Sequence, residues 1–315
     1  MAAGDVRVGF VGCGVHARER LLPAVQRVGM DLAAICDLDR RLAQRTTRRF
    51  GAFRAYQDAR AMIDEMDLDA VLVCGPPELH AEAAETALAA GCHLWTEVPV
   101  APNADEAEEI ATIAEEHGRI AQAGLNARFA PAYQRMREIV DDPEFGELRS
   151  VEIAWWVPET HGHDNPVLFD LVHALDLVRH LGGDVVDLCV VRARQANTLA
   201  IALELQADAV ATISFTGRAL CPRERVEVAS LDANVTTNGR QQVILHSSKR
   251  EETAVWGYDA MRVRESEMQW EPTGHIAQLR HFAESVLGDT EPEATFTEAV
   301  AAMRLAERIA QIERS

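Results

Sequence analysis

Apolar and polar positions divide the chain into two regions with different periods. From about residue 6 to residue 125, near-continuous apolar runs of strand length alternate with amphipathic segments of helix length. Buried strands separated by helices are typical of a parallel sheet covered on both faces, so this region predicts a doubly wound α/β domain. The predicted strands are VRVGFVG, DLAAICD, AVLVCGP, CHLWTEV and RIAQAGL. The predicted helices are HARERLLPAVQRVG, RRLAQRTTRRFG, ELHAEAAETALAAG and a segment capped by Asn103 and Glu106 that ends at Gly118.

Beyond about residue 125 apolar residues alternate with polar ones, and turn residues separate several of the runs. Such alternation predicts a large, mainly antiparallel sheet. Helices are expected at about 130–141 and 166–181, and two more from about 274 to 314. We therefore predict two domains, 1–124 and 125–315. The predicted strand segments are RSVEIAWWV, VDLCVVRARQ, LAIALELQ, AVATISFTG, ERVEVASLDANVTTNG, QQVILHSS and MQWEP.

A glycine motif follows the first predicted strand and opens the first helix. Gly12, Gly14 and Ala17 have the G-x-G-x-x-A spacing. The first glycine permits the tight turn, the second lets the backbone approach a pyrophosphate, and the alanine keeps the helix close to the sheet. The helix N-terminus then faces the phosphate charge. The motif predicts a dinucleotide site; the alternative is a tight strand–helix turn without a ligand.

Asp37 stands at the end of the second predicted strand, twenty residues past the motif. A carboxylate there accepts hydrogen bonds from the ribose hydroxyls of NAD and repels the 2′-phosphate of NADP. NAD is therefore the favoured cofactor, although Arg40 and Arg41 could soften that preference. The alternative role for Asp37 is an N-cap of the next helix, which is compatible with ribose binding.

The net charge of −19 and the pI near 5.0 limit the partners of the protein. Such a surface repels phosphate backbones and anionic lipid, so nucleic-acid and membrane-surface roles are not expected. The six cysteines are scattered and form no C-x-x-C pair, which favours reduced core thiols. No signal peptide is recognised and no apolar run approaches a membrane span, so we expect a soluble cytoplasmic protein.

The chain resembles the Gfo/Idh/MocA oxidoreductases over nearly its whole length. The resemblance is carried by DAVLVCGPPELHAEAAETALAAGCHLWTEVP, by GLNARFAPAY and by HALDLVRHLGG. It implies an NAD-binding domain at 1–124 and a substrate-binding and oligomerisation domain at 125–315. It also implies that Glu97 and Asn126 take part in cofactor binding.

Two positions depart from the family pattern. Val98 stands where the family has the catalytic lysine of its Glu-Lys-Pro motif, and Lys249, the only lysine, is no obvious replacement. Phe169 stands where the family has an aspartate four residues before its histidine, and the nearest acid, Asp170, is one step further round the helix. Val98, Phe169 and Asp170 are therefore candidate substrate-pocket residues.

His173 and Asp176 match the family's His-x-x-Asp helix, and both are predicted to be catalytic. His173 is the leading proton-transfer group, because imidazole titrates near neutral pH; the alternative is a helix histidine satisfied by Asp176 or a carbonyl. His161 and His163 precede this helix beside Asp164 and are further candidates for substrate contacts. We expect no metal site.

The predicted function is an NAD(H)-dependent oxidoreductase that acts on a sugar, a cyclitol or a related cyclic alcohol or ketone. The missing lysine leaves two alternatives open. One is a non-catalytic NAD-binding sensor or partner protein, and the other is a glycoside hydrolase or lyase that retains its NAD. One face of the broad sheet in the second domain is expected to need cover from another copy of the chain. We therefore predict a homodimer or homotetramer that assembles through this domain.

Overall fold

The computed structural model describes residues 5–158, 169–193, 198–217, 219–249, 253–257 and 271–314. The chain forms two compact units. The first contains Met1–Asn126 and Gly274–Ala301, and the second contains Ala127–Thr273 and Ala302–Ser315. The first break lies two residues from the predicted one. Residues 274–301 also belong to the first unit. The predicted domains, 1–124 and 125–315, placed these residues in the second domain.

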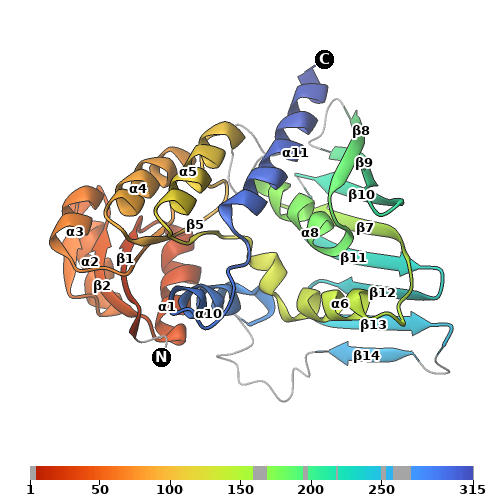
Figure 1. Cartoon of the computed structure of the whole chain (residues 1–315), viewed down its shortest axis with the longest axis horizontal. Helices are drawn as coiled ribbons and strands as arrows, with labels where there is room; N and C mark the ends of the chain where they lie inside the picture. The colour runs from red at the N-terminus through yellow and green to blue at the C-terminus, as the bar shows by residue number, and fades with distance from the viewer. Residues whose placement is uncertain are drawn as a thin grey trace. The chain divides into compact units, whose positions relative to one another are not determined.

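The first unit is built on a six-stranded parallel sheet in the order β3-β2-β1-β4-β5-β6 (Figure 1). The order reverses between β1 and β4, as in doubly wound folds, where ligands bind outside the carboxyl ends of the strands. The strands are β1 (Arg7–Val11), β2 (Asp31–Cys36), β3 (Arg54–Tyr56), β4 (Ala70–Val73), β5 (His93–Thr96) and β6 (Ala121–Ala123).

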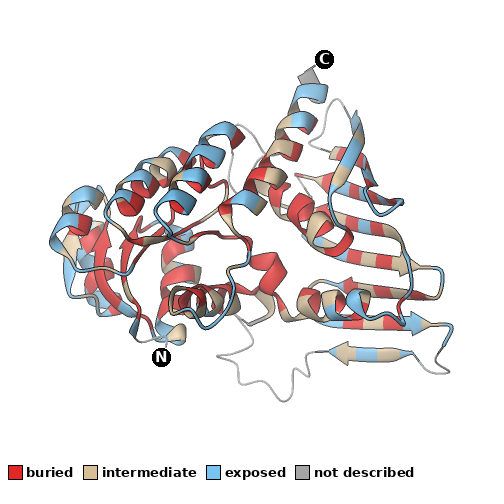
Figure 2. Cartoon of the chain, in the orientation of Figure 1, coloured by how far each residue is buried: buried red, intermediate tan, exposed pale blue. Residues whose placement is uncertain are grey.

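Two layers of helices cover this sheet. Helices α3, α4 and α5 neighbour one another in one layer, and α2, α1 and α10 in the other (Figure 1). Their buried positions lie on the sides that face the strands (Figure 2). The helices are a π-helical turn at Ala17–Leu21, α1 (Leu22–Val28), α2 (Arg40–Phe50), α3 (Ala59–Glu65), α4 (Pro77–Ala89), α5 (Ala104–Glu116) and α10 (His275–Val286); α11 (Phe296–Arg314) begins in this unit and continues into the second.

The second unit is built on an eight-stranded sheet in the order β14-β13-β12-β11-β7-β10-β9-β8. Its pairings are antiparallel except for that of β7 with β10, so the prediction of a mainly antiparallel sheet is confirmed. The strands are β7 (Leu148–Trp156), β8 (Val185–Ala193), β9 (Thr198–Leu205), β10 (Ala209–Thr216), β11 (Arg223–Ser230), β12 (Ala233–Asn238), β13 (Gln242–Ser247) and β14 (Ala254–Gly257).

Burial alternates along these strands, as their sequence pattern predicts. In β9, Leu199, Ile201 and Leu203 are buried, whereas Ala200 and Ala202 between them are exposed. Helices α6 (Pro131–Asp141) and α8 (Val172–Gly182) cover the buried face, which Figure 2 shows as bands of alternating burial. On the opposite face, described residues such as Ala200, Ala202 and Val210 are exposed.

Several elements differ from the predicted ones. Strand β3 and helix α3 were not predicted, because a three-residue strand is too short to display a period. The segment ERVEVASLDANVTTNG forms two strands rather than one run, since the Ser230 hydroxyl accepts the N–H groups of Asp232 and Ala233 and closes a turn. Strand β14 was also missed. In MQWEP, residues 268–270 lie outside the described residues, and the remainder begins a 3₁₀ turn, Glu271–Thr273, not a strand.

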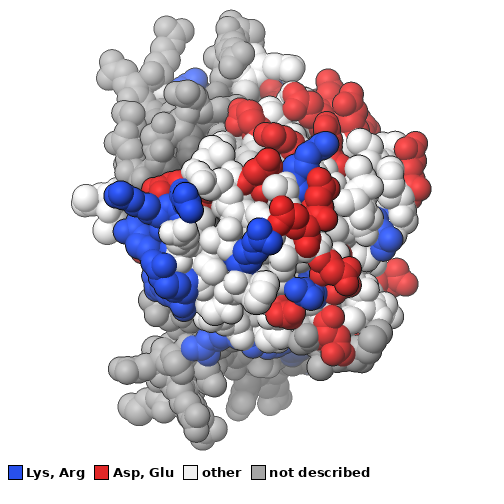
Figure 3. All heavy atoms as spheres, turned by 90° about the vertical axis from the view of Figure 1, so that its left-hand side faces the viewer, with Lys and Arg blue, Asp and Glu red and all other residues white. Residues whose placement is uncertain are grey.

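Within the described ranges, no helix combines the length and the apolar character needed to cross a membrane. All six cysteines are free. The charged side chains are unevenly distributed: on the face shown in Figure 3, acidic residues gather on one side and basic residues on the other. On this face the acidic residues are therefore not spread uniformly.

A buried histidine, His80, forms hydrogen bonds to the backbone just after β4 and just after β5. His80 lies on α4 and is 1% exposed. Its Nε2 accepts the N–H of Gly75 at 3.0 Å, and its Nδ1 lies 2.7 Å from the carbonyl oxygen of Pro99. Because the Gly75 N–H can only donate, the ring is a neutral imidazole that carries its proton on Nδ1. Burial lowers the pKa of His80, against the opposing effect of its bond to Pro99.

We expect His80→Ala to lower the free energy of unfolding by about 2–4 kcal/mol, because two buried backbone groups each lose a partner at a cost of about 1–3 kcal/mol. A histidine whose pKa is lowered by folding stabilises fully above its unfolded pKa, near 6.5, and loses that contribution as the pH falls through its folded value. The difference in the free energy of unfolding between wild type and His80→Ala should therefore become smaller at acidic pH. Urea unfolding over a pH series measures both effects.

The matched control is His117→Ala, which removes an exposed histidine just after α5. This substitution should leave the free energy of unfolding nearly unchanged. Equal stabilities of His80→Ala and wild type at neutral pH would contradict the role given to His80.

Candidate functional site

The glycine loop lies at the carboxyl end of β1 and cannot hold a side chain at its first glycine. Gly12 has φ +92°, and a Cβ there would stand 1.9 Å from the carbonyl oxygen of Cys74. Its N–H donates to the carbonyl of Cys36 at 2.8 Å. A Cβ on Gly14, by contrast, would meet no atom within 4 Å, so a ligand can approach its backbone closely. Ala17 is fully buried at the first position of the π-helical turn.

Asp37 holds this loop in place. One carboxylate oxygen accepts the N–H of Cys13 at 2.7 Å, and the other accepts the N–H of Asp39 at 2.9 Å. The cap of α2 is Asp39, whose side chain accepts the N–H groups of Arg41 and Leu42. The alternative role considered for Asp37, an N-cap, is therefore wrong. Asp37 remains half-buried at the end of β2, in the position that faces a ribose in dinucleotide-binding folds.

A groove of about 900 Å³ opens beside these residues. Its volume lies within the range of about 300–1,000 Å³ typical of small-molecule sites. The groove therefore has room for a nucleotide next to Gly14 and Asp37. Its lining also includes Cys36, Leu38, Asp58, Arg60, Gly75, Pro76 and residues of α4 such as Leu79 and Thr86.

Three thiols lie in or beside the groove. Burial raises the pKa of Cys13 and of Cys36 to about 12, and it raises that of Cys74 as well. All three are therefore protonated near neutral pH. A thiol is a weak nucleophile compared with a thiolate, so these cysteines do not form a nucleophilic site.

Glu97 follows β5 and is held against the backbone of Gly124. A Cβ on Gly124 would lie 2.7 Å from Glu97 Oε2 and 3.1 Å from Glu97 Cα, so a larger residue there would displace this carboxylate. Glu97 Oε2 also accepts the N–H of Val98 at 3.3 Å, and Oε1 lies 3.1 Å from Nε2 of His16. The Glu97 side chain is 14% exposed. The acid at the end of this strand therefore has a fixed place and a histidine partner.

His16 and His275 are site residues that sequence analysis missed. Their ring centroids lie 5.6 Å apart, and one ligand atom from each of them and from Glu97 lies within 4.8 Å of the others. Burial lowers the pKa of His16, but the hydrogen bond and charge of Glu97 outweigh it and the net shift is upward. The place of His16 inside the glycine motif could have drawn attention to it. Nothing in the sequence links His275 to Glu97 and His16, which lie 178 and 259 positions away.

Val98 is half-buried beside Glu97 and precedes the buried Pro99. Lys249 belongs to the second unit and has partners there. Its Nζ donates to the carbonyl of Glu144 at 2.9 Å and pairs with Asp232 at 3.4 Å. These contacts give no support to Lys249 as a substitute for the lysine that the family resemblance implies at position 98.

In the second unit, Asp176 forms a buried ion pair with Arg128. The Nε and Nη2 atoms of Arg128 donate to the two carboxylate oxygens at 2.7 and 2.6 Å, and the side chains are 5% and 0% exposed. Arg128 belongs to the GLNARFAPAY segment, so this pair joins two of the sequence segments that carried the family resemblance. Asn126, in the same segment, is buried at the start of a 3₁₀ turn.

His173 lies one helical turn before Asp176 on α8 and is half-buried. Its ring lies nearly parallel to that of Trp155 on β7, with centroids 6.4 Å apart. Phe169 and Asp170 are helical residues just before α8 and are also half-buried. The remaining pocket candidates, His161 and His163, lie with Asp164 outside the described residues.

A second polar group on the same face of the sheet escaped the sequence analysis. Glu224 Oε1 accepts from the hydroxyl of Tyr133 at 2.5 Å and from Nε of Arg240 at 2.6 Å. Arg240 also lies 5.9 Å from the ring of Trp155. Burial raises the pKa of Tyr133 well above its usual value, and the charge of Glu224 adds to that shift. Trp155 is therefore bordered by both His173 and Arg240.

Comparison with known proteins gives two family matches. Residues 6–125 match the Gfo/Idh/MocA oxidoreductase family, NAD-binding Rossmann fold, and residues 137–314 match the C-terminal alpha/beta domain of the same family. Among solved structures, a dehydrogenase from Chromobacterium violaceum superposes with a TM-score of 0.88 at 22% identity over 98% of this chain and 95% of that one. Levoglucosan dehydrogenase in complex with NADH and L-sorbose gives a TM-score of 0.84 at 16% identity, over 97% and 96%.

Two relatives of known name match parts of the chain. The dTDP-3,4-didehydro-2,6-dideoxy-alpha-D-glucose 3-reductase of Actinomadura kijaniata is 31% identical over 50% of this chain and 47% of its own length. The inositol 2-dehydrogenase of Arthrobacter sp. (strain FB24) is 30% identical over 61% and 58%. The chain thus spans about half the length of these relatives, whereas the two family matches together cover most of it. The chain belongs to the Gfo/Idh/MocA oxidoreductase family.

Proposed function

We propose that the protein is an NAD(H)-dependent oxidoreductase that transfers hydride to or from a sugar, a cyclitol or a related cyclic alcohol or ketone. The observation that carries the proposal is the groove beside Gly14, with Asp37 fixed at its edge. The names of the relatives, a sugar 3-reductase and an inositol dehydrogenase, support the substrate class.

The residues of the groove fit a dinucleotide. The open backbone at Gly14 and the N-terminus of the following helix suit a pyrophosphate, since unpaired N–H groups and the helix dipole favour negative charge there. Asp37 is oriented by its bonds to the loop and can accept from ribose hydroxyls. Glu97 stands at the same edge of the sheet, after β5. The bound cofactor would supply the hydride acceptor or donor.

Proton transfer is assigned to His173. Its stacking on Trp155 limits the rotation of the ring, and its half exposure leaves an edge accessible. Asp176, expected to be catalytic with it, has both oxygens bound by Arg128 and no exposure. We therefore propose that Asp176 acts by holding α8, and with it His173, rather than by touching the substrate.

Val98 leaves two alternative functions open, a non-catalytic NAD-binding sensor and a hydrolase or lyase that retains its NAD. The reason is that an apolar side chain at the lysine position cannot stabilise an alkoxide. A non-catalytic NAD-binding sensor would bind NAD and turn over nothing in a panel of polyols and ketones. A hydrolase or lyase that retains its NAD would form product with only catalytic amounts of cofactor. Spectrophotometric turnover of NAD, followed by product analysis, separates the three functions.

For the cofactor, we predict tighter binding of NAD(H) than of NADP(H). Asp37→Asn keeps an oxygen for the Cys13 N–H but removes the charge, and it should narrow the preference by roughly 10- to 100-fold, because hydrogen bonds to a charged group contribute about 1.5–3 kcal/mol. Calorimetric titration of both cofactors measures this. Glu85→Gln removes a charge elsewhere in the groove and should leave the preference intact. Tighter NADP(H) binding by the wild type would overturn the assignment.

For catalysis, we predict that His173→Ala lowers turnover by about 10²–10⁴-fold, the usual contribution of a general acid or base. NAD affinity should be nearly unchanged, because the groove residues that fit the dinucleotide, Gly14 and Asp37, are left intact. His180→Ala, on the same helix two turns further on, is the matched control and should turn over like the wild type. Wild-type turnover by His173→Ala itself would refute the assignment.

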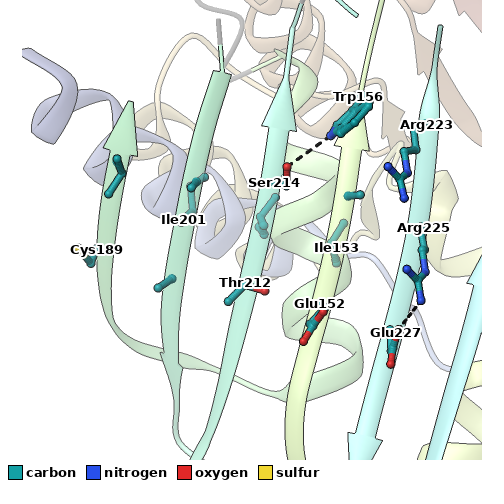
Figure 4. A pocket seen from close by; sticks show the side chains of 15 residues that line it. Glu152, Ile153, Trp156, Cys189, Ile201, Thr212, Ser214, Arg223, Arg225 and Glu227 are labelled. Atoms are coloured by element: carbon teal, nitrogen blue, oxygen red, sulfur yellow. Dashed lines mark hydrogen bonds and ion pairs between the residues drawn. The ribbon is translucent and has the colours of Figure 1, made fainter. Parts of the chain in front are cut away.

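We further propose that the chain forms a homodimer or homotetramer through the exposed face of the eight-stranded sheet. This face is hollowed by a cavity of about 450 Å³ that holds both charge and apolar surface. Figure 4 shows Glu152, Arg223, Arg225 and Glu227 on neighbouring strands, with Trp156 at one end. Arg225 pairs with Glu227 at 2.7 Å, and the guanidinium of Arg223 lies 4.9 Å from the Trp156 ring.

The assembly is tested by light scattering at micromolar concentration, where we expect a mass of at least twice 34.7 kDa. Val191 and Val210 on this face are 67% and 56% exposed. Val191→Glu combined with Val210→Glu should shift the protein toward monomer, because charges are depleted from the cores of stable interfaces. Phe53→Glu places the same charge on an exposed position of the first unit and should not. A monomeric wild type would count decisively against the proposal.

A further inference from the structure

We propose that His16, Glu97 and His275 form a binding site for one divalent transition-metal ion. One potential ligand atom from each residue lies within 4.8 Å of the other two. All three residues belong to the first unit. They come from parts of the chain far apart in sequence, so no spacing motif reveals them. The site is independent of the oxidoreductase proposal, because binding of the ion requires only these three side chains.

The ligand set selects the class of ion. Two imidazoles and one carboxylate suit Zn²⁺, Co²⁺ and similar ions, whereas Mg²⁺ and Ca²⁺ prefer sets made of oxygen alone. Two histidines and a glutamate are also a known set for zinc that keeps an open coordination position. Among such ions we take Zn²⁺ as the expected occupant and Co²⁺ as its spectroscopic substitute.

The distances are close to those that one ion requires. Ligand atoms about 2.0–2.1 Å from a tetrahedral ion lie roughly 3.3 Å from each other. Nε2 of His16 and Oε1 of Glu97 are already 3.1 Å apart. The two imidazole centroids, at 5.6 Å and tilted by 58°, lie near the roughly 5 Å expected for rings that share an ion with such bonds. A small rotation of side chains completes the set.

The fold provides a rigid base and an adjustable third ligand. His275 is the first residue of α10, is 7% exposed, and lies on a helix that packs against α1. The Glu97 carboxylate is 14% exposed and is fixed against Gly124. The His16 side chain is 48% exposed and can move toward an ion. An ion held this way would have coordination positions open on the His16 side.

An ion at this place would alter the charge next to Val98. The ion would be bound by Glu97. The residue after this glutamate is a lysine in the family motif and Val98 in this chain. The ion competes with protons for the imidazoles, so its affinity should fall in acid. Binding of metal and binding of NAD should also influence each other, because His16 is two residues from Gly14.

The test is titration of tag-free protein with Zn²⁺ and with Co²⁺, without NAD, followed by calorimetry and visible absorption. The background variant is His161→Ala with His163→Ala, which removes the only His-x-His run of the sequence from the measurement. We expect one ion per chain. We also expect cobalt bands of nitrogen and oxygen ligation, with no thiolate charge-transfer band from the cysteines.

In this background His16→Ala, Glu97→Gln and His275→Ala should each weaken binding by more than roughly 10–100-fold, the usual loss when a group that merely orients a ligand is removed. His117→Ala is the matched control and should bind like its parent. His16→Ala keeps the test decisive if the buried His275 proves necessary for folding. Absence of saturable binding, a thiolate band, or unchanged affinity in His16→Ala would overturn the site.

Discussion

The candidate site depends on the close approach of two strand ends at which no side chain fits. At Gly12 the backbone takes a left-handed conformation, and a Cβ would overlap the carbonyl of Cys74 at the end of β4. Because β1 and β4 are the strands between which the sheet order reverses, this contact lies where a doubly wound fold opens to ligands. A larger residue would separate the two strand ends or displace the glycine loop. The groove beside Gly14 follows from that constraint.

Polar side chains then fix this edge of the sheet. Asp37 holds the loop from the β2 side, His80 joins the turn after β4 to the chain after β5, and Glu97 is held by Gly124 and His16. Asp37 and His80 use buried or half-buried hydrogen bonds to the backbone, which are costly to leave unmade, whereas Oε1 of Glu97 lies 3.1 Å from a side-chain atom, Nε2 of His16. The edge is therefore preorganised before any ligand arrives, which reduces the ordering cost of binding.

Much of this arrangement could be predicted from the sequence, because it follows from local patterns. The glycine spacing, the apolar strands and the cap at Asn103 each depend on residues close together in the chain, and the structure shows that cap with Glu106. The short strand β3 and the turn at Ser230 were missed, since neither has a period to detect. His16 and His275 were missed for another reason: their meeting depends on the return of α10 to the first unit, which only the tertiary structure shows.

The charges within each unit bear on the expectation that Val98 stands where the family has a lysine. Arg128 and Asp176 neutralise each other in the second unit, as do Arg240 and Glu224, so neither arginine offers an uncompensated charge to a substrate. In the first unit, Glu97 has a different kind of partner. His16 is a group whose charge depends on pH and whose nitrogen can bind a proton or an ion. In this chain the group that faces Glu97 is the imidazole of His16, so any positive charge at this edge is conditional on what the imidazole binds.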